Sequence, residues 1–235
     1  MPEASKSFSA EVLTNPRVVE KGRFPLSRTG PPSIGLQLIV AYGLIEAALW
    51  TPVGWPNAFC IVLAALWIVW AVRRDRFTAR DMGIAVPTAS ASVWVLLGGV
   101  VLAVALPLVT LVWRNNSGPT HVMPVNQALL YIVWSFLQQF ILQSFFFVRL
   151  ESLLGGKWAV PVAAALFGTV HLPSALLTVA SLIGGLFFCA MFRRYRNIFP
   201  LGMAHALLGL MLAACFSDAL LHHMRVGLGY VRFHP

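Results

Sequence analysis

Seven long apolar blocks separated by short polar connections make up most of the chain. A helix needs about 20 predominantly apolar residues to cross a hydrocarbon core of about 30 Å. Most blocks have that length, and strand-like alternation is absent, which excludes a transmembrane barrel. The blocks lie at residues 34–50, 58–72, 89–113, 125–148, 158–172, 175–192 and 198–221. The pattern predicts an all-α bundle of about seven transmembrane helices.

Composition supports this membrane class and indicates one domain. Of 235 residues, 58% are hydrophobic and only 11% are charged, against about 45–50% and about 25% in soluble proteins. We expect a transmembrane domain over residues 34–221 and a short C-terminal tail over 222–235. Residues 1–33 mix both charge signs with Pro, Ser and Gly and lack the apolar core of a signal peptide, so they are predicted to form a cytosolic tail.

The basic residues predict the orientation of the helices. Fourteen of the 17 Lys and Arg residues lie in the N-terminal tail and in the connections after the second, fourth and sixth blocks, and Arg149 is counted among them. By the positive-inside rule, the N-terminus is cytosolic and the C-terminus lies outside, as in a bacterial inner membrane. The formal charge of +9 is explained by this bias and by anionic lipids, so no nucleic-acid partner is expected.

Polar side chains follow one face of the fourth block. Tyr131, Ser135, Gln139 and Gln143 recur every four residues, and Gln138 lies one position to the side. Because an unsatisfied amide in hydrocarbon costs several kcal/mol, this face is predicted to point into the bundle. Hydrogen bonding between helices, worth ~0.6–2 kcal/mol per contact, is the simplest role for such residues.

Two histidines lie at similar depth to these glutamines. His171 is about 13 residues and His205 about 8 residues from the cytosolic ends of their blocks, a difference of only ~8 Å at ~1.5 Å per residue. We therefore expect both histidines and at least one glutamine to line one buried cavity. Glu46 is the only carboxylate well inside an apolar block, and such acids are usually paired or functional.

Three motifs in the C-terminal half carry a family resemblance. The stretch QQFILQSFFFVRLESLLG resembles the first motif of the CAAX-protease and bacteriocin-processing family, in which two adjacent glutamates are followed after three residues by arginine. FGTVH resembles the second motif, and HALLG resembles the third, in which asparagine follows histidine by four residues. The resemblance covers residues 125–212 and implies an intramembrane endopeptidase.

The chain departs from the family pattern at the charged and polar side chains of the motifs. His171 and His205 match, whereas Gln138 and Gln139 replace the glutamate pair, Gln143 replaces the arginine and Gly209 replaces the asparagine. In the family, a glutamate helped by histidine activates a water molecule. A glutamine amide cannot accept a proton at neutral pH, so the family mechanism is lost as written.

Three functions remain open on these residues. We favour a pseudoprotease that binds a membrane peptide or serves as a subunit of a membrane complex. The alternative is an endopeptidase in which His171 or His205 is the base, Glu46 orients it, and Gln139 and Gln143 stabilise the oxyanion. The third is an enzyme or carrier for an isoprenoid lipid that uses Glu46 and the histidines.

No cofactor is predicted. Zinc held by His171 and His205 is a weaker variant of the endopeptidase, because two histidines fall short of the usual three protein ligands. The expected partners are membrane lipids and a membrane peptide or protein.

The charge bias makes a topology prediction. A cysteine placed in the N-terminal tail should react with an impermeant thiol reagent only after the inner face is opened, whereas one placed at residue 121 should react in intact cells. Labelling of position 121 only after the inner face is opened would reverse the orientation.

Overall fold

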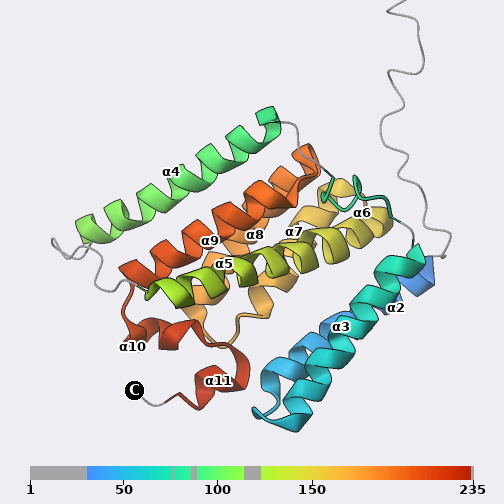
Figure 1. The fold of residues 1–235 in the computed structure, drawn as a ribbon, viewed down its shortest axis with the longest axis horizontal. Coiled ribbons are helices and arrows are strands. Elements are labelled where there is room, and N and C mark those ends of the chain that lie inside the picture. The colour runs from blue at the N-terminus through green and yellow to red at the C-terminus, as the bar shows by residue number, and fades with distance from the viewer. Residues whose placement is uncertain (1–30, 76, 86–88, 114–122, 234–235) are drawn as a thin grey trace, which may run out of the picture.

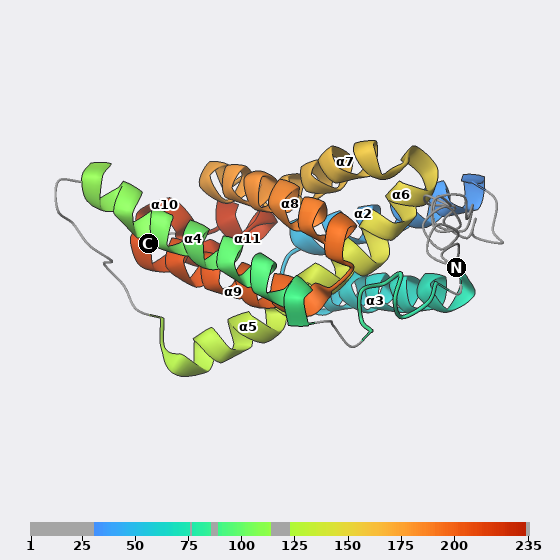
Figure 2. The ribbon, with the colours of Figure 1, turned by 90° about the horizontal axis from the view of Figure 1, so that it is seen from above.

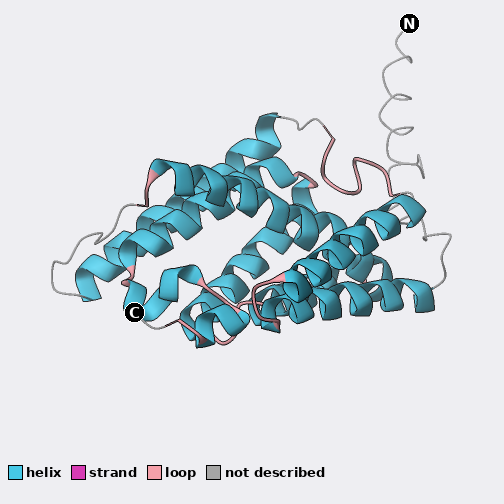
Figure 3. Ribbon diagram, turned by 60° about the horizontal axis from the view of Figure 1, so that its bottom comes forward, coloured by secondary structure: helices cyan, strands magenta, loops and turns pink. Residues whose placement is uncertain are grey.

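The computed structural model describes residues 31–75, 77–85, 89–113 and 123–233, and all the elements in these ranges are helices (Figures 1 and 3). In chain order they are α2 (Pro31–Trp50), α3 (Trp55–Asp75), α4 (Ala89–Trp113), α5 (Val125–Gln139), the π-helix η2 (Phe140–Phe147), α6 (Val148–Leu154), α7 (Gly156–Thr169), α8 (Ala175–Tyr195), α9 (Ile198–Cys215), α10 (Asp218–Leu221), the 3₁₀ turn η3 (His222–Met224) and α11 (Gly227–Val231). Most of the N-terminal tail and position 121 lie outside the described residues.

Each apolar block of the sequence forms a helix, which confirms the polytopic all-α class. Five helical segments are long and apolar enough to cross a membrane, and the fourth block is one continuous segment over α5, η2 and α6. An apolar stretch of α4 is shorter, and α7 has 14 residues. The last block ends earlier than expected, because Phe216 has an extended backbone that stops α9 at Cys215.

Helices that are neighbours in sequence do not all pack as neighbours in space. α7 packs against α8, α2 against α3, and both α4 and α5 against α9, which is therefore central to one side of the bundle (Figures 1 and 2). Close approach depends on small residues, as is usual between membrane helices. For example, a Cβ on Gly185 of α8 would lie 3.1 Å from the Cα of Ala164 in α7.

The C-terminal segment folds back over the ends of α2 and α7. The backbone N–H of Gly227 donates to the carbonyl of Leu172 at 2.7 Å. Gly227 has φ +57°, and a Cβ there would run into the backbone of Leu49, so only glycine fits without displacement. The close approach of Gly227 to Leu49 holds α11, the last described helix, against α2, the first.

Large apolar side chains cover the outward faces of the helices. Ile39 of α2, Leu66 of α3, Val101 of α4 and Val133 of α5 are each more than 60% exposed. Water would make such a surface costly, whereas lipid tails are as apolar as the side chains themselves. Together with the length of the helices, this surface identifies an integral membrane protein.

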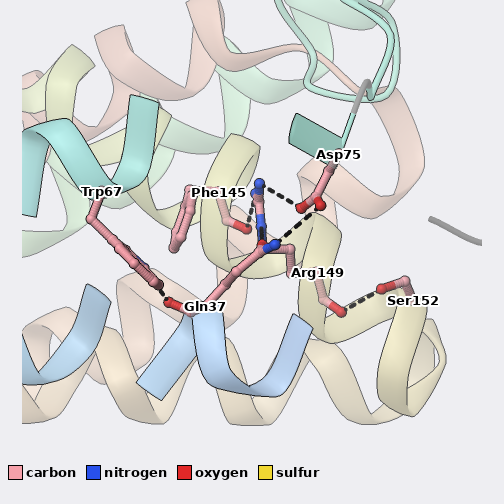
Figure 4. A network of polar contacts seen from close by, with 6 residues as sticks. All are labelled: Gln37, Trp67, Asp75, Phe145, Arg149 and Ser152. Atoms are coloured by element: carbon pink, nitrogen blue, oxygen red, sulfur yellow. Dashed lines mark hydrogen bonds and ion pairs between the residues drawn. The ribbon is translucent and has the colours of Figure 1, made fainter. Parts of the chain in front are cut away.

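A buried charge pair joins the first two helices to α6 (Figure 4). The side chains of Arg149 and Asp75 are both fully buried, with Nη2 and Oδ2 2.9 Å apart. Gln37 bridges them, because its Oε1 accepts from Arg149 Nε at 2.9 Å and its Nε2 donates to Asp75 Oδ1 at 3.1 Å. Arg149 therefore does not lie in an exposed cytosolic loop, and its assignment there from the sequence is wrong.

Aromatic rings and a carbonyl complete the surroundings of Arg149. Its guanidinium carbon lies 4.1 Å from the ring centre of Phe145 and 5.4 Å from that of Phe77. Its Nη1 donates to the carbonyl of Phe145 at 3.1 Å. A charge taken this far from water is tolerated only with such compensation. The pair therefore fixes α2 and α3 against the helix that follows the glutamines.

Removing one member of this pair should be more harmful than removing both. Asp75→Ala leaves an unpaired buried guanidinium and should lower the free energy of unfolding by about 3–5 kcal/mol. The double variant Asp75→Leu with Arg149→Met removes both charges and should be more stable than Asp75→Ala. Denaturant unfolding of the detergent-solubilised protein measures both. A change of less than ~0.5 kcal/mol in Asp75→Ala, the range of a neutral surface substitution, would contradict this role.

Candidate functional site

The helix that carries the glutamines changes its winding at the site. α5 ends at Gln139 and the chain continues as a π-helix over Phe140–Phe147, rather than as the uninterrupted α-helix that the four-residue repeat predicts. Gln143 and Ser144 are completely buried within it. A π-turn redirects side chains relative to an α-helix and often occurs at functional sites. Nothing in the amino-acid pattern indicated it.

Four buried side chains form a chain of polar contacts across three helices. Gln139 Nε2 lies 3.2 Å from His205 Nδ1, and Gln143 Nε2 donates to Gln139 Oε1 at 3.2 Å. Gln143 Nε2 also lies 3.6 Å from the Sγ of Cys189 in α8. We call Gln139, Gln143, Cys189 and His205 the amide cluster.

The direction of these contacts defines the protonation of His205. An amide nitrogen can only donate, so Nδ1 of His205 accepts and the imidazole proton is on Nε2. Gln143 donates to Gln139 in the same sense, so the contacts from Gln143 to His205 join two uncharged amides to an imidazole that accepts through Nδ1. The Oε1 of Gln143 is buried and has no hydrogen-bond partner within the described structure.

Phenylalanine rings separate the two histidines. The ring of Phe167 meets His171 edge-on at 5.0 Å between centroids and His205 at 5.6 Å, so the two imidazole centroids are no more than 10.6 Å apart. The ring of Phe188 lies 5.3 Å from that of His205. His171 Nδ1 donates to the carbonyl of Phe167 at 2.7 Å. His171 thus lies beside the amide cluster, across one aromatic ring, and is not hydrogen-bonded into it.

Two other candidate residues lie away from the amide cluster. Gln138 is only partly buried, as expected for the position next to Gln139 on a helix. Glu46 accepts from the indole Nε1 of Trp50 in its own helix at 3.1 Å. Its neighbour Tyr42 bonds Thr169 near the end of α7 at 2.8 Å. No described contact joins Glu46 to either histidine, so an orienting role for Glu46 has no support here.

Cys189 was missed as a member of the site. The sequence places it in an apolar block, where a cysteine is typically a small core residue. Its 0% exposure agrees with that interpretation, but its thiol also faces an amide. A lone cysteine in an apolar helix carries no periodic or spacing signal, and only the packing of α8 on η2 shows the contact.

The position of the family asparagine is filled by a side chain from another helix. Gly209 stands there, and a Cβ on it would overlap the hydroxyl of Tyr131 and lie 2.7 Å from its ring carbon Cε1. Tyr131 of α5 therefore occupies the space where a side chain at position 209 of α9 would begin. The loss of the asparagine and the presence of tyrosine are sterically linked.

The amide cluster has hydrogen-bonding groups but no acid. It offers amide N–H donors, one free amide acceptor and a neutral imidazole, and it contains no carboxylate that could take a proton from water. Among the described residues, no three His, Cys, Asp or Glu side chains lie close enough to hold a metal ion. Such a site can bind a polar group in hydrocarbon surroundings.

Restoring the family asparagine should be destabilising. Gly209→Asn should lower the free energy of unfolding by about 1–3 kcal/mol, because its Cβ and Tyr131 compete for one space. Adding Tyr131→Ala should recover much of that loss, which a double-mutant cycle by denaturant unfolding will measure.

Gly43→Asn in α2 is the matched control, since a Cβ on Gly43 meets nothing within 4 Å. Equal losses from Gly43→Asn and Gly209→Asn, or no recovery with Tyr131→Ala, would show that steric exclusion by Tyr131 is not the cause.

Comparison with known proteins agrees with the resemblance in the motifs. Residues 121–211 match the family model described as type II CAAX prenyl endopeptidase Rce1-like. The match begins before α5 and ends within α9, so it contains the whole amide cluster and His171. No curated protein and no solved structure matches the chain. Over residues 121–211 the chain is thus similar to the CAAX-type membrane proteases, which confirms its resemblance to the CAAX-protease and bacteriocin-processing family.

Proposed function

We propose that this protein is a non-catalytic relative of these proteases, a pseudoprotease that binds a membrane peptide at the amide cluster. The observation that carries the proposal is the neutral contact chain from Gln143 through Gln139 to His205. At two of the three positions where the family has charged groups, Gln139 and Gln143 are hydrogen-bonded to each other, and Gln139 also contacts His205. The arrangement is a coherent hydrogen-bonded core rather than a catalytic site with one missing group.

The unpaired acceptor supports binding. Gln143 Oε1 is buried without a partner, and such a group costs about 1–3 kcal/mol when it stays unsatisfied. A peptide N–H in an apolar environment lacks a hydrogen-bond acceptor. A transmembrane or lipidated segment that presents a free N–H would satisfy both groups at once. Its binding would serve a membrane complex in which this chain is a subunit.

The protease alternative depends on His205 alone. The imidazole is held between the rings of Phe167 and Phe188, and Gln139, not a carboxylate, orients its Nδ1. A histidine base normally gains from an acid that stabilises the imidazolium, which the amide cluster does not supply. The isoprenoid alternative loses its main support, because Glu46 contacts Trp50 instead of the histidines.

The proposal also covers the membrane in which the protein lies and its orientation there. We place it in a bacterial inner membrane with the N-terminus in the cytosol and the C-terminus outside. Support comes from the charge bias and from the basic last turns of α3 and α8, which carry Arg73, Arg74, Arg193 and Arg194.

The purified protein should show little or no cleavage of prenylated or membrane peptides. General-base catalysis is worth ~10²–10⁴-fold in rate, and the base is missing. Release of a fluorophore from a farnesylated peptide in nanodiscs measures turnover. Gln138→Glu with Gln139→Glu should give weak turnover at most and should lower the thermal midpoint, because it puts an acid at the buried position 139 and a second acid beside it.

Peptide binding is the positive test. His205→Ala and Gln143→Leu should weaken crosslinking of a transmembrane peptide that carries a photoreactive group, whereas His223→Ala, at an exposed histidine of the C-terminal turn, should not. Robust turnover by the unmodified chain, abolished by His205→Ala in a folded protein, would overturn the proposal in favour of a histidine-based protease.

A further inference from the structure

An apolar groove runs along the outside of the α2–α3 pair, away from the amide cluster. It has a volume of about 490 Å³ and is lined by Leu44 of α2 and by Leu63, Leu66, Trp67 and Trp70 of α3. Leu66 is 61% and Trp70 44% exposed, so the groove opens toward the surroundings of the bundle. It also lies outside the segment that matches the protease family.

Two arginines stand at one end of this groove. The guanidinium carbon of Arg74 lies 5.0 Å from the ring centre of Trp70, so a cation is held over a residue that lines the groove. Arg73 precedes it, and both are exposed in the last turn of α3. Asp75, the acid that follows them in the sequence, is buried and forms an ion pair with Arg149.

The length of the groove fits one leaflet of a bilayer. From Leu63 to Arg74 the helix advances 11 positions, or ~16 Å at ~1.5 Å per residue. Half of a hydrocarbon core of ~30 Å is ~15 Å. The distance from the first α3 residue of the lining to Arg74 therefore matches the depth of one acyl layer, and the arginines reach the headgroup level of the same leaflet.

We propose that the α2–α3 groove binds one anionic glycerophospholipid, with an acyl chain along Leu63, Leu66 and Trp70 and its phosphate at Arg73 and Arg74. Guanidinium groups bind phosphate through two parallel hydrogen bonds, and basic pockets on membrane helices are suited to anionic headgroups. α2 and α3 are joined to α6 by the buried Arg149 pair, so the lipid would lie against the part of the bundle that contains this pair.

Native mass spectrometry of the full chain with dioleoyl phosphatidylglycerol and with dioleoyl phosphatidylcholine tests this proposal. The two lipids have the same chains and differ in headgroup charge. Phosphatidylglycerol should bind at least about tenfold more tightly. Arg73→Ala with Arg74→Ala should remove that preference, and Leu66→Trp, which fills the groove, should weaken binding without changing the charge.

Arg193→Ala with Arg194→Ala is the matched control, since these are also two exposed arginines in the last turn of a helix. This variant should keep the preference for phosphatidylglycerol. Equal binding of the two lipids, an equal loss in the control variant, or no effect of Leu66→Trp would overturn the proposal and leave only a diffuse attraction of surface charge. Thermal unfolding of each variant without added lipid shows that it is folded.

Discussion

Polar groups inside a bilayer have no water to satisfy them, so they must find partners within the protein. Two polar assemblies among the described residues illustrate this constraint. One is charged and contains Arg149, Asp75 and Gln37, and the other is the neutral amide cluster. Both use a buried glutamine as a connecting group, because an amide can donate to one neighbour and accept from another.

The two assemblies have different tolerances to change. The charged one combines a salt bridge with hydrogen bonds, and loss of one charge would leave the other unpaired in a low dielectric. The glutamines of the amide cluster have no formal charge, so loss of one of them leaves no charge unpaired. Glutamines at residues 138, 139 and 143, where the family motif has acids and arginine, are therefore compatible with a stable bundle.

The pairing of Gly209 with Tyr131 shows how the altered site is kept filled. A glycine in place of asparagine would leave a void between α5 and α9, and voids in a packed interior are costly. The Tyr131 ring occupies that space. The phenylalanines around the histidines have a similar effect, since Phe167 and Phe188 surround His205 with hydrocarbon. The amide cluster is therefore bordered by aromatic rings.

The sequence by itself determined the membrane class, the approximate helix positions and the family resemblance of the C-terminal half, because hydrophobic block length and motif spacing are local properties of the chain. It also placed His205 and Gln139 at matching depth, since depth follows from counting residues along a helix. Tertiary structure alone decided that η2 is a π-helix, that Cys189 meets Gln143, that Glu46 faces Trp50 and that Arg149 is buried against Asp75. These features depend on how helices rotate and pack against one another. A cation at the end of an apolar block, such as Arg149, has the same neighbours in the sequence whether it faces water or the carboxylate of another helix.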